Sequence, residues 1–274
     1  MTAAIAVNAI CAILRPMHFP RASLPAIYRL SRGALYTFCG FCALWCLHGG
    51  NVDAADAKTQ PAAQSRPALP RGVDSYTITQ RGDGYRINIT CPQVGTPVAD
   101  AELAIWARDQ AAAFTESVQM LPTPPPVPYE LVITYETLRA SSRVISVVFF
   151  ISTSMGGAHP EPGLATFVYD RRDGRRLSYN DLFLNQEGIV RTFSDICRGS
   201  LAKQLGDRVD PAMLDAGTTP TMANFDLFAL AENGVRIFFP PYQIAPYSEG
   251  YLNVTIPLGD LAQFKPHLAF WDKP

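Results

Sequence analysis

The sequence has few of the residues that most enzyme chemistry requires. Of its 4 histidines, only His159 and His267 lie beyond the N-terminal apolar region, and neither belongs to an HExxH or CxxC arrangement that would bind zinc. There is no G-x-S-x-G elbow, and Gly156-Gly157 lacks the lysine and hydroxyl residue of a phosphate loop. We therefore expect no metal, no cofactor and no catalytic residues, and we predict that the protein is not an enzyme.

The chain also lacks an excess of positive charge. It carries 23 basic and 24 acidic residues and a net charge of −1, so no basic field is available to attract nucleic acid. With 274 residues, of which 48% are hydrophobic, it can build one large domain or two small ones around a real core. The composition is that of a globular protein.

The N-terminal region lacks the apolar run of about 20 residues that a membrane-spanning helix needs. Three arginines precede a shorter apolar run at 34–47, and Ala55-Asp56-Ala57 follows it. This order is typical of a secretory signal that is cleaved after a small residue. We predict cleavage before Lys58, with an uncleaved N-terminal anchor as the alternative.

Residues 1–57 are therefore interpreted as a signal peptide or anchor, and the protein as periplasmic or cell-envelope. Contact with a membrane is expected only through an uncleaved N-terminal segment. Met17 is an alternative start to Met1, because it leaves a signal of ordinary length.

Only two cysteines, Cys91 and Cys197, lie beyond the predicted signal. In an oxidising compartment they can form a disulfide, and a closed loop of that length would contribute roughly 4 to 5 kcal/mol in the chain-entropy model. The alternative is that both are small buried hydrophobic residues, because each lies on the apolar face of a predicted strand or helix.

The remaining chain predicts an α+β fold with a mostly antiparallel sheet and two long helices. Residues 58–72 are rich in proline, alanine and glutamine and are interpreted as a linker. Residues 73–127 predict a small N-terminal subdomain made of a hairpin and a helix over 99–120, which the proline run 122–128 ends.

Residues 128–270 predict the main C-terminal domain. We expect a second core helix over 187–205, because apolar residues recur there at three- and four-residue spacing. The alternating and β-branched runs predict strands over 129–140, 143–152, 164–171, 225–231, 235–239 and 251–256, followed by a helix over 257–264.

Four arginines flank the predicted turn at Asp173-Gly174, at positions 171, 172, 175 and 176. Such a basic tip could contact an acidic partner or an anionic polymer of the envelope. Because charges beside a turn are usually only solvated, we favour the interpretation as an ordinary surface turn.

Several motifs resemble a known family. They are Gly156-Gly157-Ala158-His159, Asp173-Gly174-Arg175-Arg176-Leu177, Asp181-Leu182-Phe183, Phe239–Gly250 and Val254–Pro257. They resemble the C-terminal domain of unknown function that the lysozyme-sensing anti-sigma factor RsiV shares with the peptidoglycan deacetylase PdaC. Residues 73–127 are similar to the smaller domain that precedes it. The resemblance implies a cell-envelope protein whose partner is a lysozyme-type muramidase or a peptidoglycan fragment.

The family motifs fall in two loops that interrupt strands, so we predict that these loops lie at the same end of the sheet and form one surface. Tyrosines in a proline-rich loop give large contact area at low entropic cost. The predicted partner-binding residues are Gly156, Gly157, His159, Tyr242, Tyr247 and Glu249. The alternative function is an envelope hydrolase or esterase that acts on peptidoglycan and uses His159 with a carboxylate such as Glu249.

Overall fold

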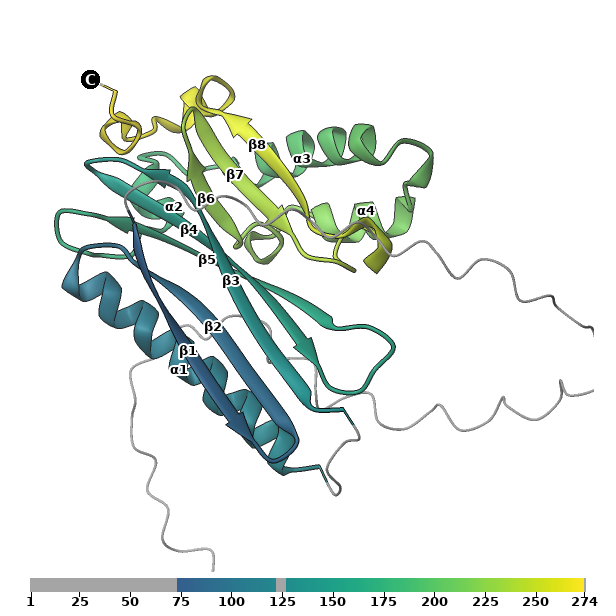
Figure 1. Cartoon of the computed structure of the whole chain (residues 1–274). Coiled ribbons are helices and arrows are strands. Elements are labelled where there is room, and N and C mark those ends of the chain that lie inside the picture. Colours follow the sequence, from purple (N-terminus) through teal and green to yellow (C-terminus); the bar gives the residue numbers. More distant parts are fainter. Residues whose placement is uncertain (1–72, 122–126, 274) are drawn as a thin grey trace, which may run out of the picture. The chain divides into compact units, whose positions relative to one another are not determined.

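The computed structural model describes residues 73–121 and 127–273 of the chain (Figure 1). The predicted signal or anchor at 1–57, the linker at 58–72 and the prolines of 122–126 lie outside the described residues. Within the described ranges, no helix combines the length and the apolar character needed to cross a membrane.

A five-stranded sheet contains the first strands in the order β1-β2-β3-β4-β5. Its elements are β1 (Asp74–Gly82), β2 (Tyr85–Gln93), α1 (Pro97–Gln119), β3 (Tyr129–Ala140), β4 (Val144–Ser154) and β5 (Glu161–Asp170). All neighbouring strands are antiparallel except β2 and β3, which are parallel. A parallel pair needs a crossover connection, which α1 provides. The sheet is therefore continuous across the predicted boundary between 73–127 and 128–270.

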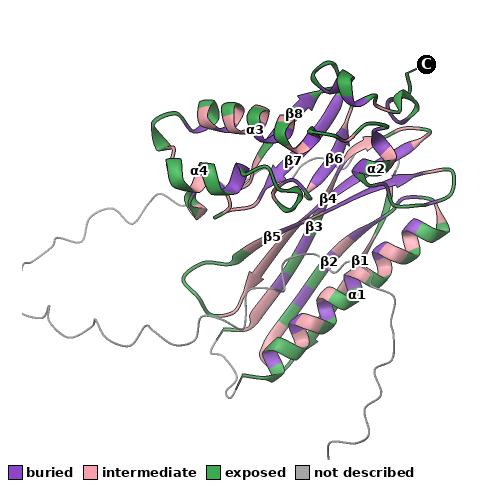
Figure 2. Ribbon diagram, turned by 180° about the vertical axis from the view of Figure 1, so that it is seen from behind, coloured by how far each residue is buried: buried purple, intermediate pink, exposed green. Residues whose placement is uncertain are grey.

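The predicted amphipathic helix is present as α1. Its buried side chains recur every three or four residues and form one stripe: Ala99, Leu103, Ala107, Ala111, Phe114 and Val118. This stripe packs on the β2 and β3 side chains of the same cluster, as the alternation of buried and exposed residues along α1 in Figure 2 shows. The Asp100 carboxylate accepts hydrogen bonds from the backbone N–H groups of Val94 and Gly95 at 2.6 and 3.2 Å, which secures the start of the helix.

The remaining strands form a second, three-stranded antiparallel sheet in the order β6-β7-β8. Its strands are β6 (Phe228–Ala231), β7 (Gly234–Phe239) and β8 (Leu252–Pro257), preceded by α2 (Tyr179–Leu182), α3 (Ile189–Leu205) and α4 (Pro211–Thr218). The predicted α+β class with mostly antiparallel strands is confirmed, and the strands are divided between two sheets. The reason is that β6 and β7 pack face to face on the first sheet: Ala229 and Phe238 share a cluster with Val148 and Leu164.

The other face of the three-stranded sheet carries the largest cluster of buried residues. Val235, Ile237 and Phe239 of β7 alternate toward it and share it with Phe193 and other buried residues of α3. The predicted second core helix is thus confirmed, and it ends at Gly206, whose φ of 57° few other residues adopt readily.

The helix expected over 257–264 is partly wrong. Pro257 ends β8, and the following segment is the 3₁₀-helix η5 (Leu258–Phe264). Its buried residues, Leu258, Leu261 and Phe264, are three residues apart, which is the period of a 3₁₀-helix and not of an α-helix. The final 3₁₀-helix η6 (Leu268–Trp271) is held by the Trp271 indole, which donates to the Gly234 carbonyl at 3.1 Å.

The disulfide considered from the sequence is wrong. Cys91 and Cys197 are both free and fully buried. Cys91 lies between α1 and the five-stranded sheet, whereas Cys197 lies between α3 and the three-stranded sheet, so they belong to different clusters. The alternative interpretation, two small buried hydrophobic residues, agrees with this structure, and burial raises the pKa of both thiols.

Candidate partner-binding site

The two family-matching loops meet in the structure. The connection between β4 and β5 carries His159, and the connection between β7 and β8 carries Tyr242 and Tyr247. The His159 ring stacks on the Tyr247 ring with centroids 4.0 Å apart and planes 18° apart. The Tyr242 hydroxyl lies 3.4 Å from His159 Nε2. The prediction that the two loops form one surface is confirmed, and we call His159, Tyr242 and Tyr247 the aromatic cluster.

The aromatic cluster is open to solvent. His159 is exposed, Tyr242 is 56% exposed, and Tyr247 is half-buried beneath them. Rings of this size are usually covered in a folded protein, because burying one contributes about 2 to 3 kcal/mol. An exposed stack of two rings with a third ring beside it is therefore an available contact surface.

The β4–β5 connection turns sharply before it reaches the cluster. Gly156 has φ +82°, and a Cβ there would also lie 3.4 Å from the Tyr129 ring, so a side chain at this position would be strained. Gly157 faces no such restriction, because a Cβ there would meet only the His159 carbonyl at 3.6 Å. Of the two predicted glycines, only Gly156 has a conformational reason to be glycine.

The position of the His159 ring is set by its two nitrogens. Nδ1 lies 3.1 Å from the Pro160 carbonyl oxygen, and Nε2 faces the Tyr242 hydroxyl. A proton on Nδ1 satisfies both contacts, because Nδ1–H then donates to the carbonyl and Nε2 accepts from the hydroxyl. The ring is thus oriented with its face against Tyr247.

The β7–β8 connection is held in one conformation. Tyr242 has φ 70°, a left-handed conformation that costs a non-glycine residue about 1 to 2 kcal/mol. Its backbone N–H donates to the Ala245 carbonyl at 2.9 Å, and Ile244 and Ala245 are buried in the core beneath it. The loop therefore presents Tyr242 outward on a rigid support.

A second anchor joins this loop to the end of α4. The Gln243 side-chain amide donates to the carbonyl oxygens of Gly217 and Asn224 at 3.1 and 3.0 Å. Gly217 is in such close contact with the Gln243 carbonyl that a Cβ on Gly217 would overlap it. No local sequence pattern pointed to this contact, because the two segments are far apart in the chain.

Glu249 does not contribute its carboxylate to the aromatic cluster. It lies in the 3₁₀-helix η4 (Tyr247–Glu249) and forms an ion pair with Arg208 at 3.1 Å. Within the described part of the chain, no hydrogen bond or ion pair joins it to His159. The carboxylate and the imidazole expected for a hydrolase are therefore not paired here, and Glu249 instead fixes η4, on which Tyr247 lies.

Tyr251 is a residue of this region that the sequence reasoning missed. Its hydroxyl faces the carbonyl oxygens of Ile151 and Gly163 at 3.3 and 3.4 Å, and its ring packs against Phe150 at 5.3 Å. Burial raises the pKa of Tyr251 to about 12. Tyr251 thus joins the start of β8 to β4 and β5 close to the two loops, a role that no sequence signal distinguishes from that of other tyrosines.

The basic tip does not present four free charges. Arg172 and Arg143 pair with the buried Asp170 carboxylate at 3.3 and 3.0 Å, and Arg175 pairs with Asp181. Arg176 lies 3.4 Å from Glu102 and over the Phe167 ring. This agrees with the interpretation of an ordinary surface turn.

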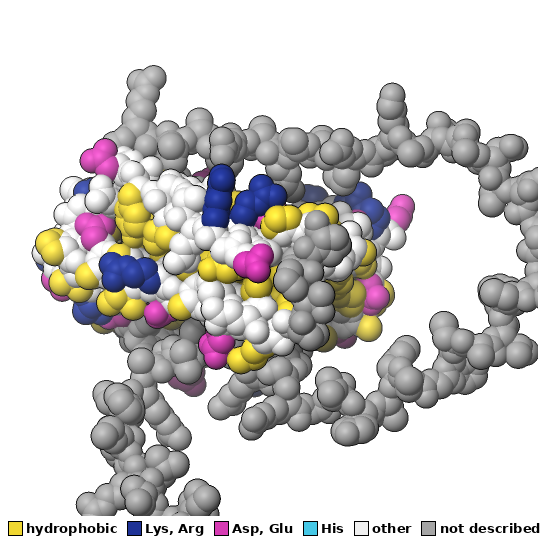
Figure 3. All heavy atoms as spheres, turned by 60° about the horizontal axis from the view of Figure 1, so that its bottom comes forward, with side chains coloured by type: hydrophobic (Ala, Val, Ile, Leu, Met, Phe, Trp, Pro, Cys, Tyr) yellow, Lys and Arg dark blue, Asp and Glu magenta, His cyan; other side chains and the backbone are white. Residues whose placement is uncertain are grey.

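The surface seen in Figure 3 carries no large field of one sign. Hydrophobic, basic and acidic side chains are interspersed on this face. Among residues 73–121 and 127–273, no three His, Cys, Asp or Glu side chains gather in a way that could hold a metal ion. The chemistry that the aromatic cluster offers is stacking and hydrogen bonding.

Together these features define a class of protein: an α+β protein of two sheets that presents exposed aromatic side chains from two neighbouring loops. Residues 180–259 match the family described as "Protein of unknown function (DUF3298)". The chain belongs to this DUF3298 family. Tyr242, Tyr247 and Glu249 lie inside the matched range, and His159 lies before it.

Two named relatives are similar to the chain. It is 26% identical over 181 residues to the peptidoglycan-N-acetylmuramic acid deacetylase PdaC of Bacillus subtilis. This alignment covers 66% of this chain and 38% of PdaC. The chain is also 30% identical over 185 residues to the immunogenic protein MPT64 of Mycobacterium tuberculosis. This alignment covers 66% of this chain and 78% of MPT64. The chain thus spans less than half of PdaC and about four fifths of MPT64.

A solved structure of a DUF3298 family protein from Pseudomonas aeruginosa also aligns with the chain. The alignment has a TM-score of 0.48 and 19% sequence identity, and it covers 71% of this chain and 93% of that protein.

Proposed function

We propose that this protein is an exported, non-catalytic protein of the bacterial cell envelope that binds a lysozyme-type muramidase or a cell-wall component through the aromatic cluster. The observation that supports this proposal is the exposed stack of His159 on Tyr247, with the Tyr242 hydroxyl beside it. These rings come from loops more than eighty residues apart, and they converge on one surface without forming a hydrophobic core.

The rigidity of the loop favours binding. Tyrosine is enriched among the residues that dominate protein interfaces, because it offers a large ring and a hydroxyl with only two side-chain torsions. Here the Ile244 anchor and the Tyr242–Ala245 hydrogen bond already fix the loop. A ligand would therefore lose little affinity to ordering the surface on which it binds.

The named relatives support a ligand at the cell wall. The name of PdaC says that it deacetylates a residue of peptidoglycan, the polymer of the bacterial wall outside the cytoplasmic membrane. The N-terminal charge and hydrophobicity pattern predicts export to the same place. Because the chain spans only 38% of PdaC, we do not extend the deacetylase activity to it.

The test compares binding by the purified protein and two variants. Co-sedimentation with insoluble peptidoglycan tests the cell-wall ligand, and titration calorimetry with a lysozyme-type muramidase tests the protein partner. Tyr247→Ala and His159→Ala each remove one ring of the stack, and we expect a loss of affinity of about tenfold or more, the size of a typical interface hot spot. Leu184→Ala is the matched control. Leu184 is also an exposed apolar residue, with 69% of its surface exposed, but it lies beside Lys265 and not in the aromatic cluster.

Two results would contradict the proposal that this protein is a non-catalytic binding protein. One is the absence of binding to either ligand at high micromolar concentration. The other is turnover of peptidoglycan that His159→Ala abolishes without a change in melting temperature, since this would support the envelope hydrolase or esterase. Equal weakening by Leu184→Ala would show that binding does not depend on the aromatic cluster.

A further inference from the structure

The edges of the two sheets are protected unequally. The β5 edge is covered, because the Leu177 backbone N–H and the Arg176 guanidinium donate to the carbonyl oxygens of Val168 and Thr166 at 2.7 and 2.9 Å. On the β8 edge, the Gln204 side chain donates to the Asn253 carbonyl at 3.1 Å. Such contacts keep an edge strand from pairing with another chain.

The β1 edge has no comparable cover within the described ranges 73–121 and 127–273. Gly82 pairs with Tyr85 across a two-residue turn. Residues that flank such a turn exchange backbone hydrogen bonds with the neighbouring strand, and alternate residues point their N–H and C=O groups the other way. Thr77, Thr79 and Arg81 therefore present their backbone groups at the free edge.

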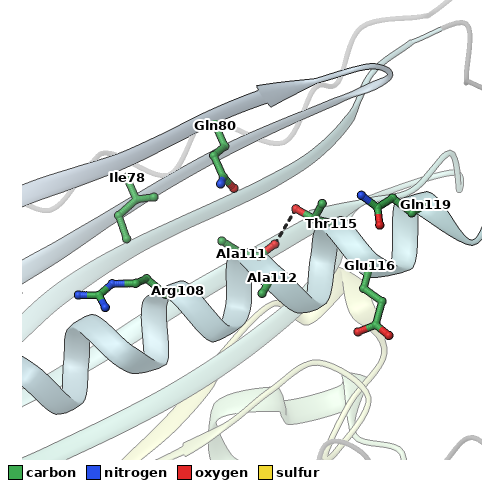
Figure 4. Close-up of a pocket in the computed structure, with 8 residues that line it drawn as sticks. All are labelled: Ile78, Gln80, Arg108, Ala111, Ala112, Thr115, Glu116 and Gln119. Carbon is green, nitrogen blue, oxygen red and sulfur yellow. Dashed lines mark hydrogen bonds between the residues drawn. The ribbon is translucent and has the colours of Figure 1, made fainter.

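A hollow of about 460 Å³ lies beside this edge, between β1 and α1 (Figure 4). Ile78 and Gln80 of β1 face Ala111 and Ala112 of α1 across it. An open edge strand with a helix beside it is the arrangement in which extended peptides add to a sheet: the edge supplies main-chain hydrogen bonds, and the groove accepts alternate side chains.

The groove has a direction. Since α1 crosses from the end of β2 to the start of β3, it runs parallel to β1. Arg108 lies below Ile78 at one end, and Thr115 and Gln119 lie at the other end (Figure 4). The Arg108 guanidinium makes no ion pair or hydrogen bond with any residue that the structure describes. The Glu116 carboxylate also lines the hollow but points away from β1 in this view.

We propose that the free edge of β1 and the groove beside it bind an extended peptide segment of a partner protein. The segment adds antiparallel to β1 as a sixth strand. It carries an apolar residue over Ala111 and Ala112 and, two residues later, an acidic residue opposite Arg108. Residues two apart on a strand lie on one face and about 7 Å apart, which is close to the rise of about 4.5 to 6 Å from Arg108 to these alanines along α1.

A second copy of this chain fits the groove less well. Suppose that β1 paired antiparallel with β1 of another copy, with the two Ile78 residues opposite each other. Asp74 of one copy would then lie opposite Gly82 of the other. The only carboxylate on β1 would then lie away from Arg108, at the polar end of the groove. Pairing about Tyr76 would instead place Asp74 opposite Ile78, close to Arg108, but residue 72, a glycine, would then stand opposite Gln80 where the groove takes an apolar side chain. The charge of Arg108 therefore favours a segment of another protein.

The test uses fluorescence anisotropy with the purified full chain and a short labelled peptide of alternating Thr and Gln into which Val-Thr-Glu has been placed. Two matched peptides carry Val-Thr-Lys and the reversed order Glu-Thr-Val. We expect the Val-Thr-Glu peptide to bind about fivefold more tightly than the Val-Thr-Lys peptide, the size of an exposed ion pair. R108E should reverse this preference.

The backbone requirement is tested at Thr79. Proline is tolerated on an edge strand where the N–H faces solvent, so T79P removes one outward donor while β1 stays paired with β2. T79A keeps the donor and is the matched control. We expect T79P to lose at least about tenfold in affinity and T79A to bind as the wild type does, with both variants melting at similar temperatures.

Three outcomes would overturn the proposal: no binding of any of the three peptides at millimolar concentration, equal binding by T79P and T79A, or equal affinity for Val-Thr-Glu and Val-Thr-Lys. A wild-type dimer in sedimentation analysis that T79P dissociates would assign the edge to a second copy instead. Tyr247→Ala should leave peptide binding unchanged, so that this proposal and the aromatic-cluster proposal succeed or fail separately.

Discussion

Asp170 is a buried carboxylate that two arginines hold in place. It is 1% exposed, and its carboxylate accepts a hydrogen bond from the Arg172 backbone N–H at 3.0 Å in addition to the ion pairs with Arg143 and Arg172. Burial alone would raise the pKa of Asp170, but the hydrogen bonds from Arg172 and the charges of both arginines lower it below its usual value.

Asp170→Asn should therefore destabilise the protein by about 3 kcal/mol at pH 7, because it leaves Arg143 half-buried without its partner. The folded-state pKa is lowered, so the stabilisation by Asp170 is present above the unfolded pKa of about 3.9 and is lost as pH falls through the folded value. Urea unfolding of both proteins should show a difference that narrows below about pH 4.

Asp173→Asn is the control for this experiment. Asp173 lies in the same turn but is exposed, and it accepts a backbone hydrogen bond from Arg175 that asparagine can also accept. It should change the free energy of unfolding by less than about 0.5 kcal/mol. If the Asp170→Asn difference were as large at pH 3 as at pH 7, the ion pairs would not be its cause.

At the scale of elements, periodicity predicted the faces of α1 and α3 but missed the geometry of η5. Both long helices repeat their apolar residues every three to four positions, and burial follows that stripe. In η5 the spacing of Leu258, Leu261 and Phe264 is strictly three. Three residues in a short segment are compatible with either helix, so the sequence pattern favoured the commoner α-helix.

The β7–β8 connection is an element whose shape depends on a distant contact. Its backbone at Gln243 presses against Gly217, so its conformation is set partly by α4. The sequence predicted a proline-rich loop with outward tyrosines, and the structure contains it. The left-handed Tyr242 had no signal, because glycine and asparagine are the residues that normally mark such positions.

Gly217→Ala should destabilise the protein by about 2 kcal/mol and weaken ligand binding at the aromatic cluster, because the added methyl group overlaps the Gln243 carbonyl. Gly199→Ala in α3 is the matched control, for which we expect the opposite effect on the free energy of unfolding. A Cβ at Gly199 meets nothing within 4 Å, so helix propensity should stabilise the protein by about 0.5 to 1 kcal/mol. Thermal melts of both variants measure this difference, and destabilisation by both would argue against the steric explanation.

At the scale of the whole molecule, the division of the strands into two sheets decides where the cysteines lie. Cys91 and Cys197 are buried on separate sheets. We therefore expect the denatured protein, once alkylated, to have the same intact mass with and without prior treatment with reductant, because no bridge between Cys91 and Cys197 has to be reduced first. In the native state, a thiol reagent should label both cysteines only at the rate of unfolding. Rapid labelling of either one, or a mass that shows a bridge, would contradict the packing described.

The sequence by itself determined the α+β class, the faces of the long helices, the hairpin and the two loops whose motifs resemble the family, because each is written in local periodicity, turn residues or short motifs. The tertiary structure alone decided the separation into two sheets, the open β1 edge, the pairing of Glu249 with Arg208 and the stacking of His159 on Tyr247. The physical reason is that local patterns state which residues avoid water, whereas partners far apart in the chain are chosen by competition among all the surfaces that can cover them.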